Sequence, residues 1–306
     1  IGVTPSQFIS ARAECVPLVF VRPFAYSLAH LEAARKVGAT GFLPRTTPEE
    51  CLVDDAAAHL LHTVGTRVPL SRAFHRVAKA NGVSLPQGLF AGLTADLNLI
   101  ASAPYLLPRW LEMPDGHQVV GPVYANLPGE VPEFVTDLAA GPKPLVYFAV
   151  GSSGNRDLVL DVLRGLGRAD CQVLAPVRSH LHQEDLETLP HNIHVTDWIP
   201  THQLGDAVDL AITHGGEGTV QTSCVQGWPF IGIPLQLEQR FNVQRCVAFG
   251  SARLVSQKEA RRADWAALVR EALADDVMRS RARRVAELMK GLDGPGRAAE
   301  AICKLL

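Results

Sequence analysis

Short runs of β-branched and aromatic residues alternate along this chain with longer segments of helical periodicity. In the second half the runs predict parallel strands at 145–150, 172–177, 192–198, 209–213, 230–235 and 252–256. Helices are predicted between and after them, at about 155–167, from Thr219 onwards, and at about 258–274, 276–291 and 295–306. Strand–helix alternation of this kind is typical of βαβ units, in which helices cover both faces of a parallel sheet.

The first half follows the same pattern less regularly. A helix at about 5–15 leads into a strand at 17–24, helical periodicity covers 47–80, and further strands are expected at 96–104 and 118–124. A sheet of so few strands would leave much apolar surface uncovered. The sequence also lacks an initiator methionine and opens like the middle of an α/β domain. We therefore expect an N-terminal domain that is either small and atypical or lacks its first strands.

Composition and charge narrow the class of protein. The chain has 306 residues, 47% of them hydrophobic and 20% charged, which fits one large or two ordinary globular domains. A net charge of -2 gives no electrostatic basis for binding nucleic acid. No apolar run is long enough to span a membrane, and no signal peptide opens the chain. Six scattered cysteines without a CxxC pair indicate buried free thiols, and hence the cytoplasm.

The segment AITHGGEGT (211–219) carries the strongest local signal. Glycine allows the backbone to approach a ligand closely, and the helix start at Thr219 presents unpaired N–H groups. His214 and the Thr219 hydroxyl, either as a donor or as a helix cap, would complete an anion site suited to phosphate. A tight turn that serves packing only is the alternative. A second glycine loop, GSSGN (151–155), ends another strand of the same sheet and is expected to face the same ligand.

Other nucleotide and nucleophile motifs are absent: the sequence has no GxxxxGK[ST], no GxGxxG after a strand and no GxSxG. Residues 197–242 instead resemble the donor-binding signature of family 1 glycosyltransferases, GT-B enzymes related to macrolide, flavonoid and sterol glycosyltransferases. Trp-x-Pro, HGGxGT, Gly-x-Pro, an acidic residue with Gln, and Asn occur there in the family's order and spacing. VGPVY (120–124), VYFAVGSSG (146–154) and GPGRAAEAI (294–302) match the family as well.

The resemblance implies an α/β protein of GT-B fold with two Rossmann-like domains, the N-terminal one incomplete. It places the acceptor-side domain at 1–124, a linker at 125–144, and a nucleotide-sugar-binding domain at 145–306, whose last helix crosses back to the first domain. It implies that the donor's diphosphate is bound by Ser152, Ser153, His214, Gly216, Gly218 and Thr219. The base would be bound by Trp198, Ile199 and Pro200, and the sugar by Glu238, Gln239 and Asn242.

The chemistry of these side chains agrees with such roles. Carboxylate and carboxamide groups can satisfy the donors and acceptors of sugar hydroxyls, and tryptophan offers a flat apolar face. Taken singly, Trp198 reads as a core aromatic residue and Glu238-Gln239 as a solvated loop. It is their joint occurrence at the family's spacing that favours a site.

Two departures from the family matter. Thr222 stands where the plant enzymes have a ribose-binding glutamate, which leaves uridine and thymidine donors both open. The loop that carries the family's general base would precede this chain, so the base is assigned to no residue. The explanations are a truncated reading, a partial gene, or a second chain that supplies the missing strands.

The reaction implied by the resemblance is a direct, inverting displacement on a UDP- or TDP-sugar by a hydroxyl of a small-molecule or lipid acceptor. No cofactor or metal is expected, because His214 and the helix start neutralise the leaving group. The alternatives are a non-catalytic nucleotide-sugar-binding half of a split transferase, a nucleotide-sugar 2-epimerase, and a cell-wall lipid transferase.

The remaining histidines and arginines are read as structural or solvated. Four histidines in 180–194 do not have the spacing of a zinc site, and His59 and His62 are interpreted as surface residues, with acceptor contact as the alternative. RRADW (261–265) and RSRARR (279–284) are expected to be exposed helical faces.

Overall fold

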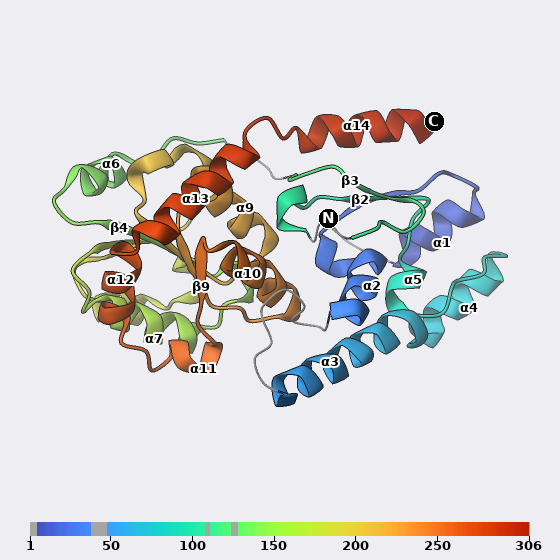
Figure 1. The fold of residues 1–306 in the computed structure, drawn as a ribbon, viewed down its shortest axis with the longest axis horizontal. Coiled ribbons are helices and arrows are strands. Elements are labelled where there is room, and N and C mark those ends of the chain that lie inside the picture. Colours follow the sequence, from blue (N-terminus) through green and yellow to red (C-terminus); the bar gives the residue numbers. More distant parts are fainter. Residues whose placement is uncertain (1–4, 38–47, 108–110, 124–127, 306) are drawn as a thin grey trace. The chain divides into compact units, whose positions relative to one another are not determined.

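The computed structural model of the chain describes residues 5–37, 48–107, 111–123 and 128–305 (Figure 1). Contacts between residues divide the chain into two compact units. The first comprises Ile1–Val123 with Leu292–Leu306, and the second is Tyr124–Gly291. Each unit has a parallel sheet of its own.

The first unit contains a three-stranded parallel sheet in the order β1-β2-β3. Its strands are β1 (Val19–Arg22), β2 (Leu97–Ile100) and β3 (His117–Val119). Its helices are α1 (Pro5–Ala13), α2 (Leu28–Val37), α3 (Pro48–Arg67), α4 (Arg72–Ala80), α5 (Leu89–Gly92) and α14 (Gly294–Leu305). The predicted strands are all present but shorter, and the sequence pattern missed α2.

Proline and glycine explain where these elements end. The helical pattern predicted over 47–80 is interrupted between α3 and α4, where Pro69 lacks the N–H that a continuous helix needs. The strand predicted to reach 124 ends at Val119, because Gly121 has a φ of +101° and Pro122 cannot donate to a ladder. In each case the hydrophobic pattern continues beyond the residue at which the backbone ends the helix or strand.

Helix α14 belongs to the first unit although it follows the second in sequence. It packs against β2, and its residues Ala298 and Ala301 share a buried cluster with Leu99 of β2 and Val120. The partly buried Ile302 packs against the same cluster. The last helix therefore covers one face of the first sheet.

The second unit contains a six-stranded parallel sheet in the order β6-β5-β4-β7-β8-β9. Its strands are β4 (Leu145–Ala149), β5 (Gln172–Ala175), β6 (Ile193–Val195), β7 (Leu210–Thr213), β8 (Phe230–Gly232) and β9 (Ala252–Leu254). Its helices are α6 (Glu133–Ala140), α7 (Arg156–Leu166), α8 (Gln183–Glu187), α9 (Glu217–Gln226), α10 (Leu237–Phe249), α11 (Gln257–Ala260), α12 (Trp265–Leu273) and α13 (Asp276–Met289).

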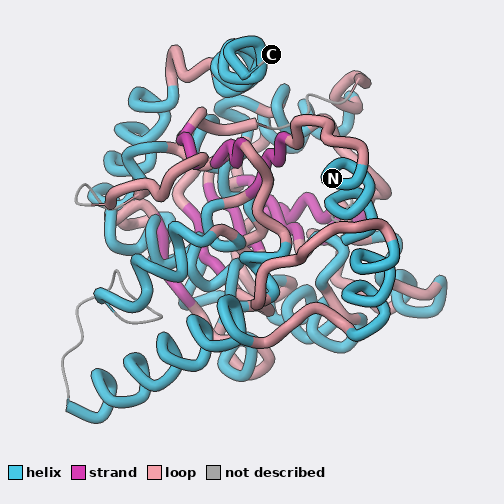
Figure 2. Tube along the Cα trace, turned by 90° about the vertical axis from the view of Figure 1, so that its right-hand side faces the viewer, coloured by secondary structure: helices cyan, strands magenta, loops and turns pink. Residues whose placement is uncertain are grey.

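Helices cover both faces of this second sheet (Figure 1, Figure 2). On one face Phe148 and Ile212 pack in a single apolar cluster with Leu163 of α7 and Trp265 of α12. On the other face Tyr147 contacts Trp228, which follows α9, with ring centroids 5.7 Å apart. The central strands β4 and β7 are buried along their whole length, which explains why their sequences are apolar runs rather than alternating patterns.

The strand order has a direct consequence for ligand binding. The chain proceeds from β4 outward to β6, then returns to the other side of β4 as β7 and continues to β9. The order reverses between β4 and β7, and open α/β sheets bind ligands in the crevice that forms at such a point, outside the carboxyl ends of the strands. The loops 151–154 and 214–216 follow β4 and β7 at this edge.

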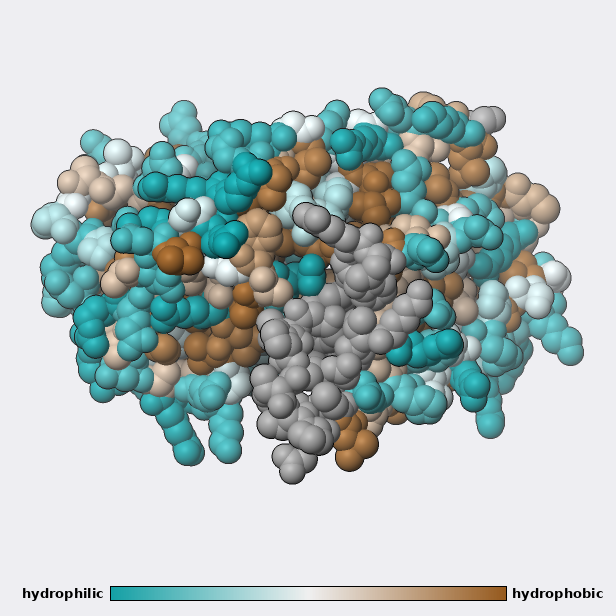
Figure 3. Space-filling view, viewed as in Figure 1, coloured by the Kyte–Doolittle hydropathy of each residue, from teal (hydrophilic) through white to brown (hydrophobic). Residues whose placement is uncertain are grey.

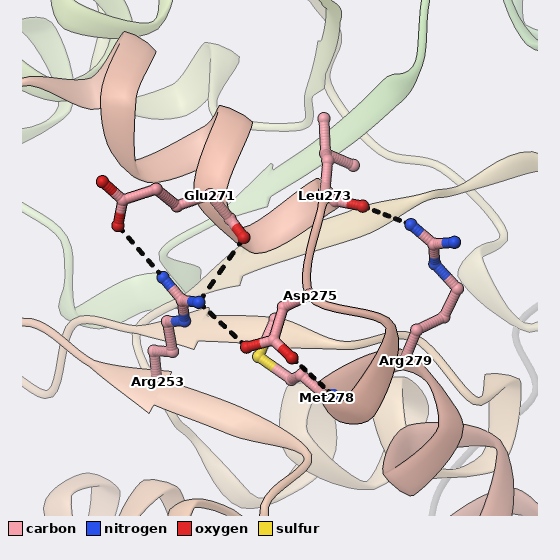
Figure 4. A network of polar contacts seen from close by, with 6 residues as sticks. All are labelled: Arg253, Glu271, Leu273, Asp275, Met278 and Arg279. Atoms are coloured by element: carbon pink, nitrogen blue, oxygen red, sulfur yellow. Dashed lines mark hydrogen bonds and ion pairs between the residues drawn. The ribbon is translucent and has the colours of Figure 1, made fainter.

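Away from that edge, one polar network fixes the last helices of the unit (Figure 4). Arg253 on β9 donates to the Asp275 carboxylate at 2.9 Å and lies 3.4 Å from the Glu271 carboxylate of α12. Asp275 in turn caps α13 by accepting from the backbone N–H of Met278 at 2.9 Å. One arginine thus joins the edge strand to the end of α12 and the start of α13.

Hydrophilic residues gather over α13 on the face shown in Figure 3. Arg281, Arg283 and Arg284 are exposed, as expected for RSRARR. In RRADW, Arg261 is also exposed and pairs with Asp161 at 2.9 Å, but residues 261–264 lie between α11 and α12 and Trp265 is buried, so the expectation of an exposed helical face is wrong there. None of the helices in the described part of the chain is long and apolar enough to cross a membrane.

The described cysteines are all free, but only some are buried. Cys171, Cys224 and Cys246 are buried, while Cys15 and Cys303 are exposed, which corrects the expectation of uniformly buried thiols. Cys51 lies outside the side chains that the structure describes.

Candidate functional site

His214 lies at the end of β7, enclosed by the two glycine loops. Its side chain is only 7% exposed, and its ring lies between Gly151 and Gly216. A Cβ atom at Gly151 would lie 2.8 Å from Cε1 of the ring, and one at Gly216 would lie 2.6 Å from Nε2. Both distances are shorter than real Cβ contacts, so the imidazole can occupy this place only because both neighbours are glycines.

The environment of His214 favours a neutral imidazole. Burial lowers the pKa of His214, the charge of His180 lowers it further, and the nearby Ala149 carbonyl partly offsets the shift. Ring atom Nδ1 is buried and no described atom reaches hydrogen-bond geometry with it. A neutral imidazole carries one N–H, which is the form that donates a single hydrogen bond to an anion.

Helix α9 begins two residues earlier than the sequence predicts, at Glu217, with Gly216 at its N-cap and no capping side chain. The prediction that Thr219 caps the helix is therefore wrong. Its hydroxyl donates to the Gly216 carbonyl at 2.9 Å and accepts from the Thr213 hydroxyl at 2.9 Å. The backbone N–H groups of Gly218 and Thr219 belong to the first turn, which has no partners within the helix.

Glu238 and Asn242 lie one turn apart on α10, and both are buried rather than part of a solvated loop. Asn242 Nδ2 donates to the Glu238 carboxylate and to the Gly215 carbonyl, the latter at 3.1 Å. The backbone N–H of Glu217 also donates to the Glu238 carboxylate. Burial raises the pKa of Glu238, whereas the hydrogen bonds from Asn242 and from the Glu217 backbone lower it. The carboxylate therefore lies at the same helix start that sequence analysis assigns to an anion.

Gln239 connects α10 to the other glycine loop. Its Nε2 donates to the Ser153 hydroxyl oxygen at 3.0 Å, and its Oε1 accepts from the backbone N–H of Leu235 at 2.9 Å. Gln236, which sequence analysis did not select, also donates to Ser153, at 3.3 Å. Because the Ser153 oxygen accepts from both amides, its own O–H remains to donate elsewhere. Ser152 is exposed beside it.

The residues predicted to bind the base lie beyond β6. Trp198 is 46% exposed, so part of its ring is open to stacking, while Ile199 and Pro200 are buried. A Cβ atom at Gly129 would lie 3.1 Å from the Trp198 ring, and Gln203 fixes the Gly129 carbonyl with a hydrogen bond of 2.8 Å. Thr222, at the position of the family's glutamate, donates to the Gly218 carbonyl at 2.9 Å.

Sequence analysis missed one histidine of this site. His180 follows β5, and its Nε2 lies 2.7 Å from the Gly151 carbonyl oxygen. A Cβ atom at Gly154 would lie 3.4 Å from His180 Cε1. From the sequence, His180 is interpreted as one of the solvated histidines of 180–194. No local pattern indicates its contact with Gly151, because the adjacency of β5 and β4 arises from the strand order.

The other histidines are placed elsewhere. His62 is partly buried and lies 3.5 Å from the exposed Glu32 of α2, whereas His59 is exposed as predicted. His194 contacts the Gln172 side chain at 2.9 Å. Among the described residues, no three His, Cys, Asp or Glu side chains are grouped so that they could hold a metal ion.

Comparisons with solved structures define the class of fold. The glycosyltransferase VinC, solved in complex with dTDP, aligns with 94% of this chain and 66% of its own at a TM-score of 0.63 and 17% identity. The fold is that of the GT-B glycosyltransferases, so the predicted α/β class is confirmed.

Comparisons of sequence define the relatives. Residues 160–305 match the model of the erythromycin biosynthesis protein CIII-like C-terminal domain. A PGL/p-HBAD biosynthesis glycosyltransferase of Mycobacterium tuberculosis (strain ATCC 25177 / H37Ra) is 29% identical over 192 residues, which are 63% of this chain and 44% of the relative. The 4'-demethylrebeccamycin synthase of Lentzea aerocolonigenes is 31% identical over 202 residues, 61% of this chain and 47% of the relative. The resemblance to family 1 natural-product glycosyltransferases is confirmed, and the chain spans less than half the length of these curated relatives.

Proposed function

We propose that the second unit binds a UDP- or TDP-sugar and that the protein transfers the sugar to a hydroxyl of a small-molecule or lipid acceptor. The observation that carries this proposal is the position of His214 between Gly151 and Gly216, at the point where the strand order reverses between β4 and β7. A buried neutral imidazole beside the start of α9 is suited to a diphosphate. The relatives named as glycosyltransferases, and the dTDP bound by VinC, support the same class of ligand.

The proposed contacts follow from the groups that remain available. His214 and the backbone N–H groups of Gly218 and Thr219 bind the diphosphate, and the Ser153 hydroxyl donates to it. The Thr219 side chain takes no part, because its hydroxyl is engaged within the loop. Trp198 stacks on the base with its exposed face. Gln239 retains one Nε2 hydrogen for a sugar hydroxyl, since its other hydrogen is directed to Ser153.

The proposed reaction is a single displacement with inversion. The acceptor oxygen attacks the anomeric carbon, the bond from that carbon to the diphosphate oxygen breaks, and a general base takes the acceptor proton. His214 and the start of α9 stabilise the charge that develops on the leaving diphosphate. We assign the general base to no residue of this chain.

A donor-binding half that depends on another polypeptide is the second candidate. The described first sheet has three strands, and the chain spans less than half of its curated relatives. In that case a second chain or a further segment would supply the acceptor side and the base. A nucleotide-sugar 2-epimerase is a third reading, which product analysis separates from transfer.

Calorimetric titration with UDP and dTDP tests the donor site. We expect binding, and we expect His214→Ala to weaken it by about 1–3 kcal/mol, the value of a hydrogen bond to a charged group. His59→Ala is the matched control, because His59 is an exposed histidine of the first unit. Absence of binding by the unaltered protein, or equal affinity of the His214 variant, would contradict the proposal. Binding without hydrolysis or transfer of a UDP- or TDP-sugar would favour the donor-binding half.

A further inference from the structure

Gly151 adopts a backbone conformation that favours glycine, although its flexibility leaves the orientation of the next peptide unit to be fixed by another group. Its φ is +51°, in the left-handed region, and the His214 ring excludes any side chain there. Glycine adopts positive and negative φ with nearly equal ease. The peptide unit that joins Gly151 to Ser152 would therefore turn over readily unless another group held it.

His180 is the group that holds this peptide. The Gly151 carbonyl can only accept, so the contact of 2.7 Å means that His180 Nε2 carries the proton and donates. The peptide unit is planar and trans, so fixing its carbonyl toward His180 directs the Ser152 N–H to the opposite side. One hydrogen bond on the rim of the loop thereby sets the direction of a backbone donor.

His180 is itself well supported, as a positioning group must be. It ends a short helical turn in which the Arg178 backbone N–H donates to the Thr196 carbonyl at 3.1 Å. The Arg178 guanidinium donates to the Leu181 carbonyl at 3.2 Å and to Gln183 at 3.0 Å. At the far end of the loop, Gln236 and Gln239 hold Ser153. Both ends of 151–153 are thus fixed by side chains from neighbouring elements.

We propose that His180 is a positioning residue of the donor site: by holding the Gly151 carbonyl it presents the Ser152 N–H to the diphosphate. This inference rests on the proposed function, because it presupposes a diphosphate at the loop. It concerns a residue that does not itself touch the ligand. We therefore expect His180 to affect binding of the phosphates and not binding of the base or ribose.

The test compares nucleoside diphosphates with nucleosides. UDP, dTDP, uridine and thymidine are titrated into the unaltered protein and into His180→Asn and His180→Gln. The glutamine amide nitrogen reaches as far as Nε2 of histidine and can donate to the Gly151 carbonyl, whereas the asparagine amide is one methylene shorter. We expect His180→Asn to lower affinity for UDP and dTDP about tenfold, the value of one hydrogen bond. Affinity for the nucleosides should stay unchanged, and His180→Gln should remain within about threefold of the unaltered protein.

Each outcome separates the two proposals. Failure of the unaltered protein to bind either diphosphate overturns the proposed function. Binding by the unaltered protein, with His180→Asn equal to it, overturns only the role of His180. The same holds if His180→Gln binds as weakly as His180→Asn, or if the nucleosides lose affinity in parallel with the diphosphates. His191→Ala, which removes an exposed histidine of the same unit, controls for the loss of an imidazole.

Discussion

His214 constrains its neighbours because a five-membered ring fills the space in which their side chains would begin. Gly216 and Gly218 lie two residues apart at the start of α9, yet their surroundings differ. A Cβ atom at Gly216 would overlap the His214 ring, whereas one at Gly218 would meet nothing within 4 Å. The glycines of HGGEGT therefore serve different purposes, which the sequence motif alone does not distinguish.

We expect Gly216→Ala to lower the free energy of unfolding by about 1–3 kcal/mol, because the new methyl group must displace His214. Gly218→Ala is the matched change and should be neutral or raise the free energy of unfolding by up to about 1 kcal/mol, since alanine loses less entropy in a helix. Urea denaturation of both variants measures the difference. Equal stability of the two would contradict the position assigned to the His214 ring.

Glu238 presents a carboxylate at the helix start where the proposal places a diphosphate. The two negative charges oppose each other, so Glu238→Gln should raise affinity for UDP about two- to fivefold at pH 8, as expected for a charge near a helix terminus. Burial raises the pKa of Glu238, so the carboxyl group becomes neutral as the pH falls through that value. The advantage of the glutamine variant should therefore shrink from pH 8 toward pH 4.

The stability of the same variant provides an independent check. A raised pKa in the folded state means that ionisation of Glu238 destabilises the fold as the pH rises above the ordinary glutamate pKa of about 4.3. Glutamine does not ionise, so this pH-dependent loss should disappear in Glu238→Gln. Parallel stability curves for the two proteins between pH 4 and pH 8 would show that the carboxylate is not buried as described.

Among the helices and strands, the link between β9, α12 and α13 depends on few side chains. Asp275 combines two roles there, as the cap of α13 and as the partner of Arg253. Both contacts lower the pKa of Asp275, the Arg253 hydrogen bond most. A lowered pKa contributes stability that is present above the ordinary aspartate pKa and is lost as the pH falls through the folded value.

Asp275→Ala should lower the free energy of unfolding at pH 7 by about 1 kcal/mol or more, because a helix loses its cap. The loss should diminish as the pH falls below about 3.9, where the carboxyl group is neutral in the unfolded state. Asp276→Ala is the matched control, since its side chain is 89% exposed and pairs with Arg279 of the same helix at 3.1 Å. Thermal unfolding measures the stability of both variants. An equal effect of the two changes would contradict the link between β9, α12 and α13.

For the chain as a whole, the sequence predicted where helices and strands occur better than it predicted which of them lie side by side. The strands of the second sheet are visible as apolar runs because helices cover both their faces, and Thr213-His214 is visible as the end of one of them. The order that brings β5 and β7 to either side of β4 arises from packing between distant segments, and no local pattern encodes it. His180 was missed for that reason, since its partner Gly151 lies 29 residues away.

The error in the predicted start of α9 has a different cause. Gly216 and Gly218 have low helix propensity, so the pattern placed the start of α9 at Thr219, whereas the chain begins the helix at Glu217. The predicted roles of Glu238, Gln239 and Asn242 depended on a family resemblance. What the resemblance did not reveal is that Asn242 already donates to Glu238 and to the Gly215 carbonyl, and that Gln239 already donates to Ser153.

The position of α14 gives the chain an order of assembly. Residues 124–291 form a contiguous unit, whereas the buried cluster around Leu99 and Val120 is complete only when Ala298 and Ala301 pack into it. During synthesis on the ribosome, the second unit can fold as soon as its own residues have emerged, but the first unit closes only with the final helix. Although its strands come before the second unit in the sequence, the first unit is therefore completed after it.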